Sequence, residues 1–337
     1  MGELTLSVVV PVFDEEAALP LLAERLRAVL DNLGEPYEVV AVDDGSTDGT
    51  PVVLAALRRR WPQLRVIRLR RNSGHQAALR AGLLRARGEW IASIDADLQD
   101  PPELIARMLT TARAGGLDVV YGVRADRRVD GWFKRVTAGL YYRLMRRLVG
   151  REVPAQAGDF RLLHRRVIEA LRDLPEREPV LRLVVPWLGF PSGEVSFLRA
   201  PRAAGRTKYP LARMLGLSVN SVTSFSAAPL RLATWLGLCG VAVCAVLTVI
   251  AVVAWSAGAT VSGWASLWVA ILFLGAVQLL CLGLLGEYVA RIFTAVQGRP
   301  AYLIAADTGE PDADRAAAER AAAGPPAEPV TRVPSAR

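Results

Sequence analysis

The sequence predicts an α/β protein with a mostly parallel, doubly wound sheet, followed by a juxtamembrane amphipathic helix and a two-helix transmembrane hairpin. Three observations predict this. Strand and helix patterns alternate up to residue 121, acidic residues follow two of the strands, and two long C-terminal runs carry no charge. A hydrophobic content of 52% also exceeds that of most wholly soluble proteins.

The alternation is that of successive βαβ units. Apolar runs predict strands, and amphipathic stretches between them predict helices. The strands are expected at 6–12, 38–42, 66–69, 90–94 and 118–121, and the helices at 15–33, up to 60, 74–87 and after Pro101-Pro102. A basic amphipathic helix is expected over 131–151, and the segment 157–162 is expected to lead into a further helix.

The two uncharged runs, 232–255 and 264–286, are each long enough to cross a hydrocarbon core of roughly 30 Å. Basic residues flank them at Arg231, Arg291 and Arg299, so both flanks are expected to face the cytosol. A buried helical pair within a soluble domain is the alternative.

The boundaries that follow are a catalytic domain over 1–208, a juxtamembrane helix over 209–230, two membrane helices within 231–296 and a C-terminal segment over 297–337. The juxtamembrane helix lies either along the membrane surface or against the catalytic domain. No signal-peptide pattern opens the chain, so the catalytic domain and both termini are expected in the cytosol. From about residue 307, an Ala-, Pro-, Glu- and Arg-rich composition predicts disorder.

A net charge of +8 suits anionic lipids or phosphate substrates. No zinc-finger spacing, RNA-binding aromatic motif or basic zipper organises the arginines, which argues against nucleic acid. The three cysteines all lie in apolar runs, so neither a disulfide framework nor a metal cluster is predicted.

Two carboxylates one residue apart, Asp95 and Asp97, follow a predicted buried strand. They would repel each other unless a cation shared the site. With Gln99 they offer the oxygen ligands that Mg2+ or Mn2+ prefers, and such an ion could neutralise a diphosphate leaving group. Capping or turn aspartates would produce the same short pattern.

The acidic pair at 43–44 lies at the end of a second predicted strand, and Phe13 lies at the end of a third. The carboxyl ends of parallel strands form the ligand-binding edge of such sheets. A carboxylate there could accept a hydrogen bond from a base, and Phe13 could stack on it. A strand-to-helix turn with Thr47 or Asp48 as its cap is the plainer alternative.

In combination, the segments 10–15, 42–50 and 95–102 resemble glycosyltransferase family 2. Over residues 5 to about 305 the chain resembles the bacterial polyprenyl-phosphate glycosyltransferase branch, related to dolichyl-phosphate mannose synthases. The marks of that branch are the segments 121–124, 158–162, 205–210 and 286–288, together with Arg202. Phe13 and Asp14 stand where the family usually has Tyr and Asn, and Arg206 replaces an acidic residue.

The resemblance implies a GT-A type fold, a divalent metal and a site with four kinds of residue. The catalytic residue is Asp159, beside the reacting phosphate, and the alternative is a helix-capping aspartate or one that pairs with Arg161. The donor site comprises Pro11, Phe13, Glu15, Asp44, Asp95 and Ala96; the metal site comprises Asp95, Asp97 and Gln99; and Arg124, Arg135, Arg202 and Lys208 bind phosphate groups. His75 is expected to be structural, although it lies near a helix N-terminus that could approach donor phosphates.

The predicted reaction is an inverting transfer of a sugar from a nucleotide-sugar to polyprenyl phosphate in the cytosolic leaflet of the cell membrane. The resemblance of 43–47 to the uridine-nucleotide branch favours a UDP-sugar, with GDP-mannose as the alternative. A phosphate monoester has a second pKa near 6, so Asp159 is expected to act as an aligner or weak base.

A processive polysaccharide synthase would carry a Gln-x-x-Arg-Trp motif, which is absent, and a non-catalytic scaffold would not need Asp95, Asp97 and Asp159. Glycines in the hairpin would permit a homo-oligomer.

Overall fold

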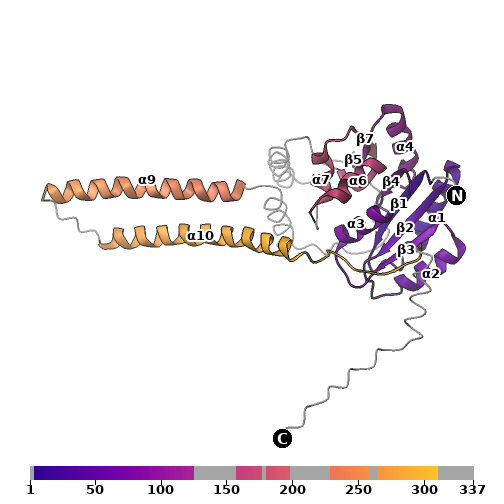
Figure 1. Ribbon diagram of the computed structural model, residues 1–337, viewed down its shortest axis with the longest axis horizontal. Coiled ribbons are helices and arrows are strands. Elements are labelled where there is room, and N and C mark those ends of the chain that lie inside the picture. Colours follow the sequence, from indigo (N-terminus) through magenta and orange to yellow (C-terminus); the bar gives the residue numbers. More distant parts are fainter. Residues whose placement is uncertain (1–3, 125–156, 177–179, 198–227, 259–263, 310–337) are drawn as a thin grey trace, which may run out of the picture. The chain divides into compact units, whose positions relative to one another are not determined.

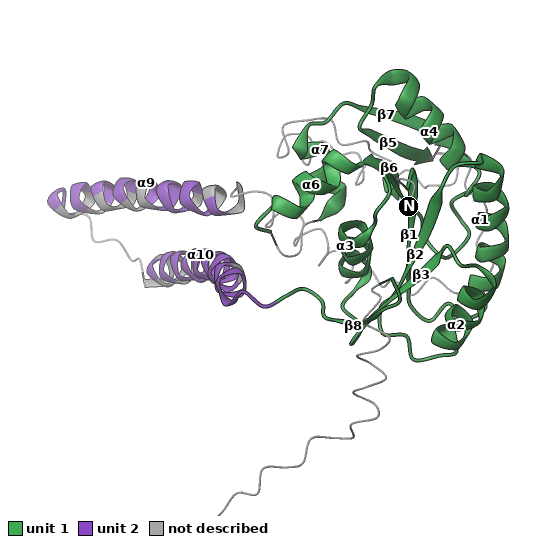
Figure 2. Ribbon diagram, turned by 45° about the vertical axis from the view of Figure 1, so that its right-hand side comes forward, with its two compact units in different colours: residues 1–142, 151–206, 300–337 green, residues 143–150, 207–299 purple. Residues whose placement is uncertain are grey.

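The computed structural model describes residues 4–124, 157–176, 180–197, 228–258 and 264–309. It divides into two compact units (Figure 2). The sheet unit comprises residues 1–142, 151–206 and 300–337, and the hairpin unit comprises residues 143–150 and 207–299.

Within the described residues, the sheet unit is built on eight strands in the order β7-β5-β6-β4-β1-β2-β3-β8. Figure 1 labels β7, β5, β4, β1, β2 and β3 of this sheet. The strands are β1 (Leu6–Val12), β2 (Tyr37–Asp43), β3 (Leu64–Leu69), β4 (Trp90–Ser93), β5 (Val119–Arg124), β6 (Ala157–His164), β7 (Ser192–Phe197) and β8 (Ile304–Asp307). The central strands β4, β1, β2 and β3 are parallel, which confirms the predicted α/β sheet.

Two strands run against this direction. Strand β6 lies antiparallel between β4 and β5, and β8 lies antiparallel to β3. Residues 157–162, expected only to lead into a helix, form most of β6, and the helix α6 (Arg165–Asp173) follows. The sheet is therefore more mixed than predicted.

Helices cover both faces of the sheet, as the apolar character of β1 requires. All seven residues of β1 are buried, because its alternate side chains pack on opposite faces. One face meets α1 (Leu19–Leu33), α2 (Thr50–Arg60) and α4 (Leu104–Gly115), where Val8 and Val10 join a core with Leu26 and Met108. The helix α3 (His75–Arg85) covers the other face, and α7 (Leu181–Leu188) packs with α6 beside β6.

The close approach of α3 to the sheet depends on Gly82. A Cβ atom at this position would overlap Cγ1 of Val9 and lie 2.9 Å from Cγ2 of Val42. Alanine favours a helix over glycine by about 1 kcal/mol, but forcing it into this contact should cost about 1–3 kcal/mol. We therefore expect Gly82→Ala to lower the denaturant midpoint of the detergent-solubilised protein, whereas Val52→Ala, on the exposed face of α2, should leave it unchanged. An unchanged midpoint for Gly82→Ala would show that α3 moves away freely.

The hairpin unit contains two long helices, α9 (Ala228–Ser256) and α10 (Trp264–Gln297), which contact each other. Cys281 Sγ on α10 lies 3.7 Å from the carbonyl oxygen of Ala233 on α9. Most of the exposed large apolar side chains of the described residues lie on this pair. Within the described ranges, one segment, Phe273–Gln297, is long and apolar enough to cross a membrane. Helix α10 continues beyond Gly286, where the second span was predicted to end.

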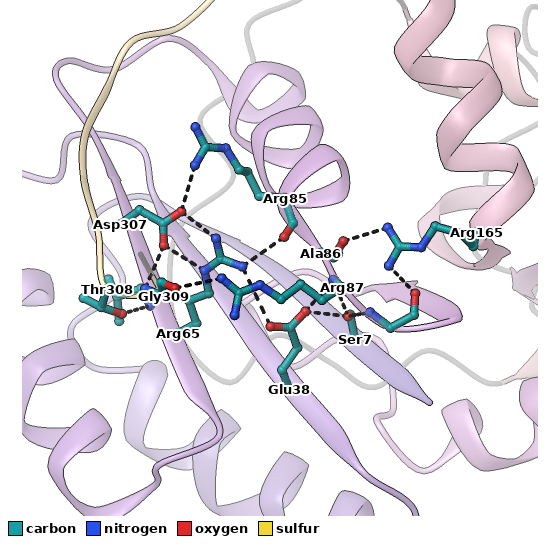
Figure 3. Close-up of polar contacts among 12 residues, drawn as sticks. Ser7, Glu38, Arg65, Arg85, Ala86, Arg87, Arg165, Asp307, Thr308 and Gly309 are labelled. Atoms are coloured by element: carbon teal, nitrogen blue, oxygen red, sulfur yellow. Dashed lines mark hydrogen bonds and ion pairs between the residues drawn. The ribbon is translucent and has the colours of Figure 1, made fainter. Parts of the chain in front are cut away.

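The chain returns from α10 to the sheet unit, where β8 pairs with β3 and forms the edge of the sheet. Figure 3 shows the polar contacts of Asp307, Thr308 and Gly309. Asp307 is buried and accepts two hydrogen bonds of 2.7 Å from Nε and Nη2 of Arg65. Val66 N donates to Thr308 Oγ1, and Arg87 Nη2 donates to the carbonyl oxygen of Gly309. The predicted start of disorder near 307 is therefore wrong for residues 307–309, because their backbone and side chains are bonded to the sheet.

Candidate functional site

The carboxyl edge of the parallel strands carries three of the predicted site segments. Phe13 follows β1 with 41% of its surface exposed, so its ring face is accessible. Asp44 follows β2, and Asp95 lies just beyond β4. Pro11 and Ala96, which were predicted to bind the donor, are buried in the strand and loop that support this edge, so their roles remain predictions.

Asp44 organises the loop that opens α3. Its Oδ1 accepts a hydrogen bond of 2.7 Å from Ser73 N, and its Oδ2 accepts one of 2.9 Å from Gly74 N. Burial raises the pKa of Asp44 and outweighs these two N–H donors, which lower it. Gly45 has φ +71°, and a Cβ there would lie 2.7 Å from the carbonyl carbon of Arg71. A carboxylate has further lone pairs, so the predicted contact with a base stays open.

Asp14, one of the departures from the family pattern, joins the loops after β1 and β2. It has φ 53°, a left-handed conformation that Asp and Asn tolerate better than most residues. Its Oδ1 accepts a hydrogen bond of 2.8 Å from Thr47 N, and its own N–H donates to Ser46 Oγ. An asparagine side-chain oxygen could accept the same bond. Glu15, predicted in the donor site, is tied to the same turn because its N–H donates to Thr50 Oγ1.

The residues predicted to hold the metal form a strained loop. Leu98 has φ 60°, which costs a non-glycine residue about 1–3 kcal/mol and is typical of functional sites. Gln99 N lies 3.2 Å from Asp97 Oδ1, and Gln99 Oε1 is buried with no hydrogen-bond partner in the described part of the chain. Among the described residues no group of three His, Cys, Asp or Glu side chains forms a closed metal cage. Two carboxylates and an amide oxygen do fit Mg2+ or Mn2+, which leave coordination positions for substrate oxygens.

Asp159 reaches this edge because β6 pairs with β4. Arg161 is in register with Ser93, whose Oγ donates a hydrogen bond of 2.5 Å to the carbonyl oxygen of Asp159. The carboxylate is held on both sides. Its Oδ1 lies 2.6 Å from Arg161 Nη2, and its Oδ2 accepts a hydrogen bond of 2.9 Å from Gln76 Nε2.

His75 links Asp159 to the predicted metal loop. Its Nε2 lies 3.3 Å from Asp159 Oδ2 and 3.6 Å from Asp95 Oδ1. The structure thus brings together two predicted site residues whose sequence positions lie far apart. His75 was expected to be structural, yet it lies between the two carboxylates with its side chain 46% exposed.

The charges around Asp159 keep it ionised. Burial alone would raise the pKa of Asp159, but the hydrogen bond from His75 and the nearby charge of Arg161 lower it strongly. In the same way, burial opposes protonation of His75, but Asp159 and Asp95 raise its pKa. Asp159 is therefore a poor proton acceptor and an anchored negative charge.

Three residues of this cluster, His75, Gln76 and Arg161, were not predicted as functional. For His75 and Gln76 the local signal was the polar start of a predicted helix after Asn72-Ser73-Gly74, and Arg161 was expected only as an alternative ion-pair partner of Asp159. Arg161 is buried within β6, and its Nη1 donates to the carbonyl oxygen of Leu181. No periodicity in the sequence distinguishes such an arginine from a solvent-exposed one.

The predicted phosphate-binding cations are not tested by the described residues. Arg124 ends β5, but its side chain lies outside them. Arg135, Arg202 and Lys208 fall in the segments 125–156 and 198–227, which lie outside the described residues altogether. Their roles remain predictions.

The chain matches two family profiles and is similar to several known proteins. Residues 7–172 match the profile of "Glycosyl transferase family 2", and residues 228–292 match that of the "GtrB C-terminal hairpin". The chain is 40% identical to "Uncharacterized glycosyltransferase YkcC" of Bacillus subtilis, over 88% of this chain and 92% of that protein. It is 38% identical to the "SfII prophage-derived bactoprenol glucosyl transferase" of Shigella flexneri, over 89% and 97%. Among solved structures, mannosyl-3-phosphoglycerate synthase from Rubrobacter xylanophilus has a TM-score of 0.47 and 17% identity, over 64% of this chain and 70% of that one.

Proposed function

Because the chain belongs to glycosyltransferase family 2, we propose that it transfers a sugar from a nucleotide-sugar to polyprenyl phosphate, with a UDP-sugar as the favoured donor. The observation that carries the proposal is the pairing of Asp95 and Asp159 across His75 at the carboxyl edge of the sheet. A relative named as a bactoprenol glucosyl transferase covers nearly the whole chain, including the hairpin, and supports a lipid-linked acceptor.

The acceptor needs little help from a base. A phosphate monoester has a second pKa near 6, so its oxygen is largely ionised at neutral pH. That oxygen would attack the anomeric carbon while the bond from this carbon to the donor diphosphate breaks, which inverts the configuration. Since Asp159 remains a carboxylate, its role is to align the reactants rather than to take a proton.

Asp95, Asp97 and Gln99 are the described residues that would hold a divalent cation. When bound, such an ion would neutralise the negative charge that develops on the nucleoside diphosphate leaving group. The protonated form of His75, favoured by its two carboxylate neighbours, would add a positive charge at the same edge. Arg124, Arg135, Arg202 and Lys208 are proposed to bind the phosphate groups of the substrates.

The hairpin unit is proposed to anchor the enzyme in the membrane that contains its polyprenyl-phosphate acceptor. Helices α9 and α10 expose apolar side chains along their lengths, as lipid-facing helices do. We propose that both cross the membrane, with the sheet unit and both termini in the cytosol, as the basic flanks Arg231 and Arg291 indicate. A polyprenyl phosphate would then be used from the cytosolic leaflet.

The test is transfer of radiolabel from a panel of UDP- and GDP-sugars to polyprenyl phosphate by the purified full-length protein in detergent. We expect a lipid-extractable sugar phosphate from a UDP-sugar, abolished by EDTA and restored by excess Mg2+ or Mn2+. Product from GDP-mannose alone would establish the alternative donor. Absence of product with every donor, from protein with a cooperative unfolding transition, would contradict the proposed reaction.

A further inference from the structure

The side-chain amide of Gln76 satisfies its donor but not its acceptor. Its Nε2 donates a hydrogen bond of 2.9 Å to Asp159 Oδ2, while its Oε1 is buried without a hydrogen-bond partner among the described residues. A buried carbonyl oxygen that has lost water and gained no donor destabilises the folded state. The unpartnered oxygen therefore offsets much of what the hydrogen bond to the charged carboxylate contributes to stability.

The Asp159 carboxylate explains why the Gln76 amide does not rotate by 180°. A rotation of 180° would point Oε1 at the carboxylate, where two acceptor oxygens would repel each other. Since Asp159 is ionised, the donor nitrogen has to face it. The orientation of Gln76 is thus determined by the carboxylate rather than by its own packing.

The other contacts of Asp159 fix its backbone and Oδ1, so the position of Oδ2 depends on residues of α3. Arg161 binds Oδ1 and is itself held by the carbonyl oxygens of Leu181 and Gly158. Ser93 holds the backbone of Asp159. Oδ2 is bound from α3, by Gln76 at 2.9 Å and by His75 at 3.3 Å. His75 is shared between Asp159 and Asp95, whereas the side-chain nitrogen of Gln76 donates to Asp159.

We propose that Gln76 is a positioning residue that fixes the plane of the Asp159 carboxylate for the transfer reaction. The inference rests on the proposed function. Polar groups retained at a cost to stability are expected at functional sites, where the position of a neighbouring group matters more than the local free energy. Gln76 acts through Asp159 and needs no contact with the substrate.

The test compares Gln76→Met with the wild-type protein. Methionine has a similar length but neither donates to Asp159 nor buries an unpartnered carbonyl oxygen. We expect kcat to fall by about 10- to 100-fold, as for other groups that orient a functional side chain, while the KM for the donor changes by less than about threefold. The apparent Tm in detergent should change little, because the lost hydrogen bond and the removed unpartnered oxygen offset each other. Gln76→Glu, which occupies the same space, should lower kcat at least as far because it opposes one carboxylate with another. Gln63→Met, at an exposed position before β3, is the matched control and should change neither quantity.

Other outcomes would overturn the inference. A Gln76→Met protein with a lower Tm but a wild-type kcat at low temperature would show that Gln76 is merely structural, while the proposed function would stand. Wild-type kcat and Tm in both Gln76 variants would also reject it. If the wild-type protein transferred no sugar with any donor, the proposed function would fail, and this inference with it.

Discussion

Replacing Asp97 by asparagine should lower sugar transfer by at least about 100-fold, the loss typical of removing one group that stabilises a developing negative charge. The substitution keeps the shape of the side chain and an oxygen that can still accept the hydrogen bond from Gln99 N. It removes the negative charge that would hold a divalent cation against the donor diphosphate. The rate at saturating donor, measured across a range of Mg2+ or Mn2+ concentrations, checks this prediction.

The controls separate metal binding from folding. Asp173→Asn removes a carboxylate at the exposed end of α6 and should leave the rate unchanged. EDTA should reduce the wild-type rate towards that of the Asp97→Asn protein and should have little further effect on the variant. A variant that kept a wild-type rate and its sensitivity to EDTA would show that the ion is held elsewhere.

Replacing Asp307 by asparagine should destabilise the sheet unit by about 3–5 kcal/mol, the usual cost of breaking a buried ion pair by removing one charge. Asp307 and Arg65 are 2% and 7% exposed, so the buried guanidinium would lose its bidentate partner and keep the carboxylate of Glu38, whose Oε2 lies 3.9 Å from Nη1. Arg85 Nη1 would lose its 3.2 Å contact with the same carboxylate (Figure 3). Denaturant unfolding of the detergent-solubilised protein measures the change.

Glu103→Gln provides a control with matched geometry. Arg25 binds Glu103 through two hydrogen bonds of 2.6 and 2.9 Å, but both side chains are about half exposed, so the loss should be at most about 1 kcal/mol. Equal effects of the two substitutions would show that the pairing of β8 with β3 contributes little to the stability of the sheet.

The contribution of the Asp307 carboxylate to stability should be lost at acidic pH. Burial alone would raise the pKa of Asp307, but the hydrogen bonds from Arg65 and Gly309 N lower it. A group whose pKa is lowered by folding stabilises the protein above its unfolded pKa, about 3.9 for Asp, and loses that contribution as the pH falls through its folded pKa. The wild-type protein should therefore lose more stability than Asp307→Asn below about pH 4.

The sequence alone determined the local elements and the segments that carry chemistry. Short apolar runs between turn signals, such as 6–12, predict strands buried on both faces, and that is how β1 is placed. Acidic residues at strand ends had to meet at one edge because parallel strands end together. The uncharged runs that form most of α9 and α10 were also evident, since a helix-length apolar segment has few other uses.

The tertiary structure alone decided which of these segments meet. Gln76 and Asp159 are 83 residues apart, and Arg65 and Asp307 are 242 residues apart. Neither pair leaves a periodic pattern, because periodicity reports which face of an element is apolar and not which partner covers it. The antiparallel insertion of β6 brings Asp159 to Ser93 and His75, and the pairing of β8 buries Asp307 in a segment whose composition resembles a disordered tail. In both cases the partner lies on a distant strand or helix, so only the folded chain makes the contact possible.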